Sequence, residues 1–169
     1  MRVLRFSFVS TMKKIIFLDF DGVMDTAYYD HYLSYMGMPA CDEYGPVFDP
    51  ECVEALRKII QQTNAEIVVS STWKDEMTFE ELQSMWTARQ LPGRIVSTTP
   101  SLGHRYHRGD EIDAWLDEHS DADCRYVIID DMDASEFNDE QIQCLLTVNP
   151  YNGLDDDSAR RADGILSQA

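Results

Sequence analysis

Three apolar runs along the chain meet polar residues at their carboxyl ends. They are IIFLDF at Ile15–Phe20, AEIVVSS at Ala65–Ser71 and RYVIIDD at Arg125–Asp131. Continuous apolar runs of this length are typical of strands buried on both faces of a parallel sheet. Weaker runs at Arg94–Ser97 and Cys144–Val148 bring the number of predicted strands to five.

Helical patterns occupy the segments between these runs. Asp49-Pro50 predicts an N-cap followed by a first-turn proline, and the apolar positions of Val53–Ile60 then share one helical face. Further helices are predicted from capping-box spacing at Thr78–Glu81, an apolar stripe at Ile112–His119 and a last amphipathic segment at Asp155–Leu166.

The alternation of strands and helices predicts an α/β fold. Parallel βαβ units would form a three-layer αβα sandwich with a mostly parallel, Rossmann-like sheet. We expect one domain over residues 13–169, after an N-terminal extension over residues 1–12. The tyrosine-rich Tyr28–Val47 segment, of about 20 residues, is predicted to be irregular and to form a small flap, since it is too short for a large cap domain.

Composition narrows the range of partners. The chain has 31 acidic and 14 basic side chains, and its net charge of −17 disfavours an extended nucleic-acid surface. No apolar run is long enough to cross a membrane, and the N-terminus lacks the apolar core of a signal peptide. The four cysteines are scattered without a C-x-x-C pair, which favours a reduced, cytoplasmic location.

Polar side chains follow the three strongest strands at the point where each ends. These are Asp19 and Asp21 after the first, Ser70 and Ser71 after the second, and Asp130 and Asp131 after the third. Ligands of open parallel sheets bind beyond the carboxyl ends of the strands. We therefore expect these groups to converge on one edge of the sheet.

Asp19-Phe20-Asp21-Gly22 places two carboxylates on the same side of an extended segment. One can attack phosphorus while the other handles protons, and Gly22 permits a sharp turn. Asp130-Asp131 indicates a hard cation held by carboxylate oxygens. Taken singly, each motif also fits a solvated turn in such an acidic chain.

Two further groups fit a phosphate pocket. Arg108, ahead of a predicted helix, can neutralise a phosphate oxygen. Ser70 can donate to another, although Ser71 and Thr72 compete for that role. Asp133 fits either the site or a helix cap.

FLDFDGV, VVSS, Arg108 and IIDD, in this order, resemble the haloacid dehalogenase (HAD) superfamily over residues 13–167. The resemblance implies that Asp19 is the nucleophile and Asp21 the general acid/base. It implies phosphoryl binding by Ser70 and Arg108, where lysine is commoner in the superfamily. The implied Mg²⁺ site comprises Asp19, Asp131 and the main-chain carbonyl of Asp21, with Asp130 in support.

A closer resemblance lies in SSTWK, RGDEIDAWL and NPYNGLDDDSA, which are similar to HAD-type phosphatase domains associated with RNA-repair proteins. Lys74 stands where that group typically has arginine. Together with Lys74, the basic residues His104, Arg105 and His107 are predicted to form a substrate rim.

The leading hypothesis is a Mg²⁺-dependent phosphomonoester hydrolase that works through an aspartyl-phosphate. Its expected substrate is a phosphorylated small molecule or the terminal phosphate of a nucleotide or polynucleotide. The alternatives are a small-metabolite phosphatase and a non-catalytic or regulatory HAD-like domain. Dehalogenation needs neither Asp21 nor a magnesium site, so both motifs argue against it.

Overall fold

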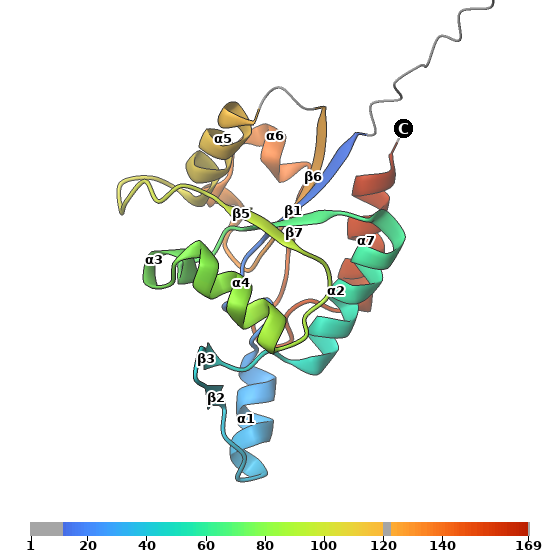
Figure 1. Cartoon of the computed structure of the whole chain (residues 1–169). Coiled ribbons are helices and arrows are strands. Elements are labelled where there is room, and N and C mark those ends of the chain that lie inside the picture. The colour runs from blue at the N-terminus through green and yellow to red at the C-terminus, as the bar shows by residue number, and fades with distance from the viewer. Residues whose placement is uncertain (1–11, 120–122, 169) are drawn as a thin grey trace, which may run out of the picture.

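The computed structural model describes residues 12–119 and 123–168, so the N-terminal extension lies outside the described residues except for Met12. Its centre is a five-stranded parallel sheet with the order β5-β4-β1-β6-β7 (Figure 1). The five predicted strands are confirmed. They are β1 (Lys13–Leu18), β4 (Glu66–Val69), β5 (Ile95–Thr98), β6 (Cys124–Asp130) and β7 (Leu145–Thr147).

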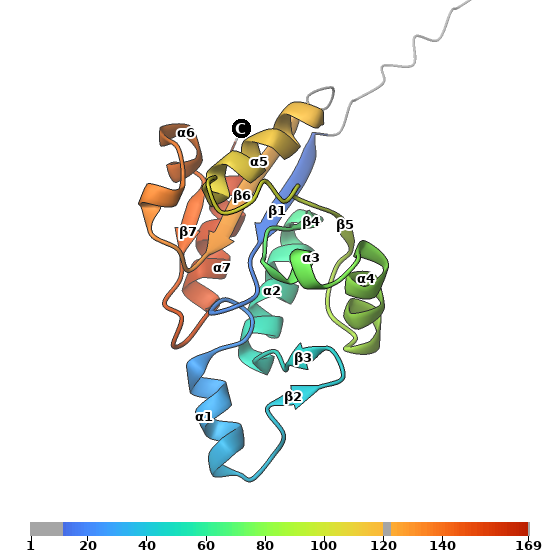
Figure 2. The same cartoon turned by 90° about the vertical axis from the view of Figure 1, so that its left-hand side faces the viewer.

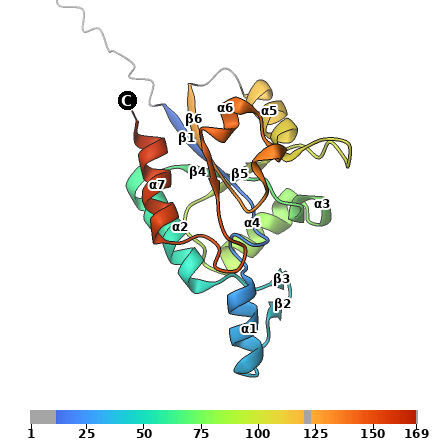
Figure 3. The same ribbon diagram turned by 180° about the vertical axis from the view of Figure 1, so that it is seen from behind.

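Helices cover both faces of this sheet, which confirms the three-layer prediction. One face packs against α2 (Pro50–Thr63), α4 (Phe79–Ala88) and α7 (Asp156–Ser167). Helix α5 (Arg108–Glu118) covers the other face, next to the short η1 (Ala134–Glu136) and α6 (Asp139–Ile142) (Figure 2). From behind, α2 and α7 are seen to lie side by side (Figure 3).

Alternation along the central strand divides the core between the two faces. Ile16 and Leu18 of β1 pack toward α2 and α7, whereas Ile15 and Phe17 pack toward α5. All four side chains are buried, as expected for a strand with helices on both sides. The apolar run that predicted β1 is therefore continuous because both of its faces are covered.

The sequence signals for helix ends are also confirmed. Asp49 caps α2 ahead of Pro50, and Thr78 and Glu81 form a capping box at α4. Asp155 caps α7, whose Ala162 and Leu166 are fully buried.

The prediction of an irregular Tyr28–Val47 segment was wrong in its first half. Helix α1 (Ala27–Tyr35) occupies it, followed by the hairpin of β2 (Cys41–Asp42) and β3 (Gly45–Pro46). Only Leu33 of α1 is buried, so the helix carries no apolar stripe for the sequence to display. This lobe projects beyond the carboxyl ends of the strands and is too small for a large cap domain (Figures 1 and 2).

Across the described ranges, no helix has both the length and the apolar character that crossing a membrane requires.

Asp49 joins the projecting lobe to the body of the fold. Its Oδ1 accepts from the Glu51 N–H at 2.9 Å and so caps α2, while its Oδ2 accepts from the Thr26 hydroxyl at 2.9 Å. The Thr26 hydroxyl in turn accepts from the Tyr29 N–H at 3.0 Å and caps α1. One buried carboxylate therefore serves two helix N-termini directly or through a neighbour.

We expect Asp49→Ala to lower the free energy of unfolding by about 2–3 kcal/mol, because it removes one cap and loosens a second. Asp155→Ala is the matched control, since Asp155 accepts from Ser158 at the N-terminus of α7 alone. It should cost about 1 kcal/mol. Urea unfolding of both variants measures the difference, and equal losses would contradict the double role of Asp49.

Candidate active site

Strand register explains why the predicted polar groups meet. Leu18 of β1 lies opposite Val69 of β4 and Ile129 of β6. The next residues along these three strands are Asp19, Ser70 and Asp130, so they stand side by side at the carboxyl edge. Main-chain hydrogen bonds continue the pairing there, from the Asp19 N–H to Ile129 at 3.0 Å and from the Ser70 N–H to Leu18 at 2.9 Å.

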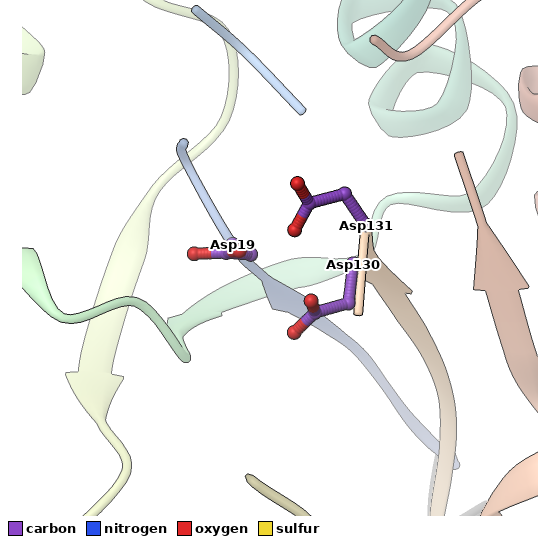
Figure 4. Close-up of side chains that lie close together, drawn as sticks. All are labelled: Asp19, Asp130 and Asp131. Atoms are coloured by element: carbon purple, nitrogen blue, oxygen red, sulfur yellow. The ribbon is translucent and has the colours of Figure 1, made fainter. Parts of the chain in front are cut away.

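Three carboxylates form the centre of the site. Asp19, Asp130 and Asp131 each offer an oxygen within 4.8 Å of the others' (Figure 4). Asp19 is 4% exposed and Asp130 is completely buried, whereas Asp131 is half-buried. Burying like charges together is unfavourable unless a cation or protons offset them.

The protonation equilibria reflect this crowding. Burial, reinforced by the charge of Asp130, raises the pKa of Asp19 to about 7. Burial also raises the pKa values of Asp130 and Asp131. The all-oxygen donor set and its excess of negative charge suit a hard divalent cation such as Mg²⁺. The residues present therefore fit the metal that the sequence predicted.

Arg108 supplies the opposing charge. Its Nη2 lies 3.9 Å from Asp19 Oδ1 and its Nε lies 3.5 Å from Asp130 Oδ2. The guanidinium is buried, and its Nη1 has no hydrogen-bond partner among the described residues. A cation between two acids with one nitrogen unused is suited to an incoming anion. The helix begins at Arg108 itself, whereas the sequence placed this residue ahead of the helix.

Close packing behind Arg108 holds the start of α5 in place. A Cβ at Gly109 would collide with the Gln141 side chain and lie 2.9 Å from the Glu136 carbonyl. The buried Gln141 amide donates to the Gly109 carbonyl at 2.9 Å and to Asp113 Oδ1 at 2.7 Å. Gly109 and Gln141 thus fix the helix that carries Arg108, a role that no motif in the sequence indicated.

The competing hydroxyls after β4 have different partners. The Ser71 hydroxyl helps to lower the pKa of Asp19 and so favours the ionised form of that carboxylate. The Thr72 hydroxyl lies 3.5 Å from Asp21. The Ser70 hydroxyl is buried without a partner in the part of the chain that the structure describes. Thr99, at the end of neighbouring β5, has the same property and was missed by the sequence analysis.

Asp21 lies apart from the three-carboxylate cluster. It is solvent-exposed, and its Oδ1 accepts from the Trp73 indole N–H at 2.9 Å. Asp25, which the sequence analysis also missed, faces it: burial and the charge of Asp21 raise the pKa of Asp25 to about 7. The signal was present, because Asp25 follows Asp21 by four residues in the same acidic run.

Gly22 leaves space for the carboxylate of Asp131, one of the three acids of the cluster. Its φ of +73° belongs to the left-handed region that glycine adopts readily. A Cβ at this position would collide with the Asp131 carboxylate and lie 2.9 Å from Pro150 Cβ. Glycine is therefore required both for the turn after Asp21 and for the space that the Asp131 side chain occupies.

Two of the four residues in the predicted substrate rim are paired with acids, and the other two are exposed. Lys74 is largely buried in an ion pair with Glu111 at 2.9 Å, and Glu111 also accepts from the Leu102 N–H. His107 pairs with Glu136 at 3.0 Å. His104 and Arg105 are exposed on the loop before α5. Asp133, which the sequence left between two roles, accepts from the Ser135 N–H and caps η1.

A cavity of about 450 Å³ adjoins the site. Asp21 and Asp131 line it on one side, and Tyr29, Leu33 and Val47 of the projecting lobe line it on the other. A larger cavity, of about 940 Å³, lies at the opposite edge of the sheet, where β1, β4 and β5 begin. The smaller cavity is the one that meets the carboxylates.

Comparison with known proteins agrees with this geometry. Residues 15–159 match the model of a family described as the HAD domain in Swiss Army Knife RNA repair proteins. No curated protein and no solved structure matches the chain. The family match runs from within β1 to the first turn of α7 and includes all three carboxylates of the cluster. The chain therefore belongs to the family of HAD domains found in Swiss Army Knife RNA repair proteins.

Proposed function

We propose that this chain is a Mg²⁺-dependent phosphomonoester hydrolase whose nucleophile is Asp19. One observation carries the proposal: buried Asp19 belongs to a carboxylate cluster that could hold a cation, and its Oδ1 also lies 3.9 Å from the guanidinium of Arg108. A binding module has no need for a buried acid in that position. A phosphatase requires it, because the nucleophile must meet both a phosphoryl group and the charges that neutralise it.

The first step is attack by an Asp19 oxygen on phosphorus, which forms an aspartyl-phosphate as the bond to the leaving oxygen breaks. The carboxylate must be ionised to attack. Arg108, the Phe20 N–H at 2.8 Å and the Ser71 hydroxyl all favour that form and oppose the effect of burial. Asp21 donates a proton to the departing oxygen.

The second step releases the enzyme. Asp21, now ionised, takes a proton from a water molecule whose oxygen attacks the phosphorus. The bond between phosphorus and Asp19 breaks, and inorganic phosphate leaves. The exposure of Asp21 suits this role because the water can reach it from solvent.

Asp19 and Asp131 would hold the Mg²⁺, together with the main-chain carbonyl of Asp21. When bound, the ion supplies charge neutralisation for the phosphoryl oxygens. Asp130 would support the site: its Oδ1 accepts from the Met132 N–H at 2.9 Å, and its buried Oδ2, without a hydrogen-bond partner among the described residues, lies 3.5 Å from Arg108 Nε. We assign it to orienting Arg108 and adding charge to the site.

Ser70 and Arg108 would bind the transferred phosphoryl group. Each has a buried polar atom without a partner among the described residues, the Ser70 hydroxyl and Arg108 Nη1. Buried donors left unsatisfied are unfavourable until a ligand accepts from them.

The substrate we propose carries its phosphate at one end, as a nucleotide or a polynucleotide terminus does. The small lobe leaves the site open to such an end, and the adjoining cavity is lined by Tyr29 and Leu33. Asp25 and Asp30 also line it, and the net charge of −17 disfavours contact with a long polyanion. Contact would thus be limited to the terminal units, near exposed His104 and Arg105.

Asp19→Asn should lower the hydrolysis of an aryl phosphate in Mg²⁺ by at least about 1000-fold, because the amide cannot serve as the anionic nucleophile. The fold should stay intact, since the change relieves like-charge crowding. Asp133→Asn is the control: it alters a neighbouring acid that only caps η1 and should retain activity. A folded Asp19→Asn protein with near-normal turnover would refute the assignment.

Mg²⁺ should stabilise the chain more at high than at low pH. The pKa of Asp19 is raised from 3.8 to about 7, so the metal-free fold holds the proton on Asp19 more tightly than the unfolded chain does. Protonation of Asp19 therefore contributes to the free energy of unfolding at low pH, and this contribution is lost as the pH rises from 3.8 to about 7. Metal binding requires the ionised carboxylates. Millimolar Mg²⁺ should therefore raise Tm by roughly 3–8 °C near pH 8, and by much less near pH 5.5.

Asp131→Asn should remove most of that shift, and Asp133→Asn should retain it. Differential scanning fluorimetry measures all three proteins. An equal shift at both pH values, or one that survives Asp131→Asn, would contradict the cation site.

Arg108→Ala should slow the single-turnover rate by about 100–1000-fold, because a donor to the transition-state charge is lost. Ser70→Ala should slow it by about tenfold or more. Arg108→Lys keeps the charge and should recover much of the loss, while Arg160→Ala, at an exposed position of α7, should leave the rate nearly unchanged. Unchanged single-turnover rates in both Arg108→Ala and Ser70→Ala would place the phosphate pocket elsewhere, with Ser71 and Lys74 the next candidates.

A further inference from the structure

The hydrogen bond between Trp73 and Asp21 links the core to an otherwise exposed carboxylate. The Trp73 indole is only 8% exposed, yet its Nε1 reaches Asp21 Oδ1 at 2.9 Å. Thr72 makes a longer contact of 3.5 Å to the other oxygen, Oδ2. Asp25 faces the same carboxylate, and the indole N–H makes the shorter of the two hydrogen bonds donated to Asp21 among the described residues.

Aromatic packing fixes the indole in turn. Phe20 meets it edge-on with centroids 5.4 Å apart, and Phe48 lies 5.7 Å away. Phe20 stands between Asp19 and Asp21 in the chain, so the same aromatic cluster anchors the segment that carries both carboxylates. Such pairs hold rings in defined orientations.

Arg89, the residue that follows α4, secures the projecting hairpin against this cluster. The Arg89 guanidinium lies 4.8 Å from the Phe48 centroid and 5.8 Å from that of Trp73. It also makes two hydrogen bonds to Asp42 of β2, at 2.7 and 2.9 Å, and one to the Gly45 carbonyl of β3 at 3.3 Å. Arginine suits this place because it stacks and makes a bidentate ion pair at once.

From this arrangement we infer that Trp73 is a positioning residue for the proton transfer by Asp21, with the Arg89–Asp42 pair securing its ring. The inference rests on the proposed function. An indole N–H can only donate, so Oδ1 must act as acceptor, and the proton for the leaving group is directed to Oδ2. Correct placement of a proton donor accounts for a large part of its catalytic effect.

The leaving group provides a readout that a merely structural role would not move. An aryl phosphate releases an aryloxide, which departs readily without a proton. A nucleoside monophosphate releases an alcohol, whose oxygen needs a proton as it departs. Trp73→Phe keeps a buried ring and removes the donor. In single turnovers it should slow formation of the aspartyl-phosphate from the nucleoside monophosphate by about 10–100-fold and from the aryl phosphate by less than about threefold, because only this first step depends on the leaving group.

Trp86→Phe is the matched control. Trp86 is buried in the same aromatic cluster, with its ring stacked near Phe20 at 6.0 Å, but its Nε1 donates to the Pro92 carbonyl. Its substitution should change both substrates by the same small factor. If Trp73→Phe folds poorly, replacing the indole by isosteric benzothienylalanine removes the N–H without a cavity and should give the same selective loss.

A second arm uses Asp21→Asn. If Trp73 acts through Asp21, Trp73→Phe should add no further loss on the nucleoside monophosphate in that background. Equal losses on both substrates in the single-turnover rate of aspartyl-phosphate formation, or full additivity with Asp21→Asn, would overturn the positioning role while leaving the phosphatase proposal standing. A wild-type chain that hydrolyses neither substrate would overturn both.

Discussion

The site depends on one electrostatic balance, which is that of three crowded carboxylates against a single buried guanidinium. Asp19 and Asp130 are brought together by strand register, and Arg108 lies within 4 Å of both. That cation does not offset three acids, so burial leaves the cluster short of positive charge. That shortage suits the edge to a divalent ion, and in the proposed function the Nη1 of Arg108, unpartnered among the described residues, would meet a phosphoryl oxygen.

Much of the surrounding structure serves to hold this balance in place. Gly22 and Gly109 each remove a Cβ that would displace a neighbour, the first beside Asp131 and the second behind Arg108. The aromatic cluster around Trp73 holds in place the indole whose N–H donates to Asp21, and the small lobe is secured against the same cluster. Rigid elements thus position each proposed reacting group, and the open lobe leaves one side of the site accessible to substrate.

The sequence predicted the strands, the helix ends and the carboxyl edge of the sheet because each of them follows from a local sequence pattern. Buried strands display apolar runs, helix ends display caps, and parallel strands bring Asp19, Ser70 and Asp130 to one edge. It did not predict α1, which buries only Leu33, or the roles of Asp25 and Trp73. The role of Trp73 depends on a contact between positions 52 residues apart in the chain, and that of Asp25, which lies close to Asp21 in the sequence, depends on its burial in the fold. Lys74 shows the same limit, since its partner Glu111 is on another helix.

The central claim is that phosphate passes through a covalent bond to Asp19, and trapping that bond tests it most directly. Wild-type protein and a nucleoside monophosphate are mixed under single-turnover conditions, quenched in acid and digested for mass spectrometry. We predict an acyl phosphate, sensitive to hydroxylamine, on the peptide that contains Asp19. Phosphate on a different residue, or complete turnover with no phosphorylated peptide at any time point, would contradict the account.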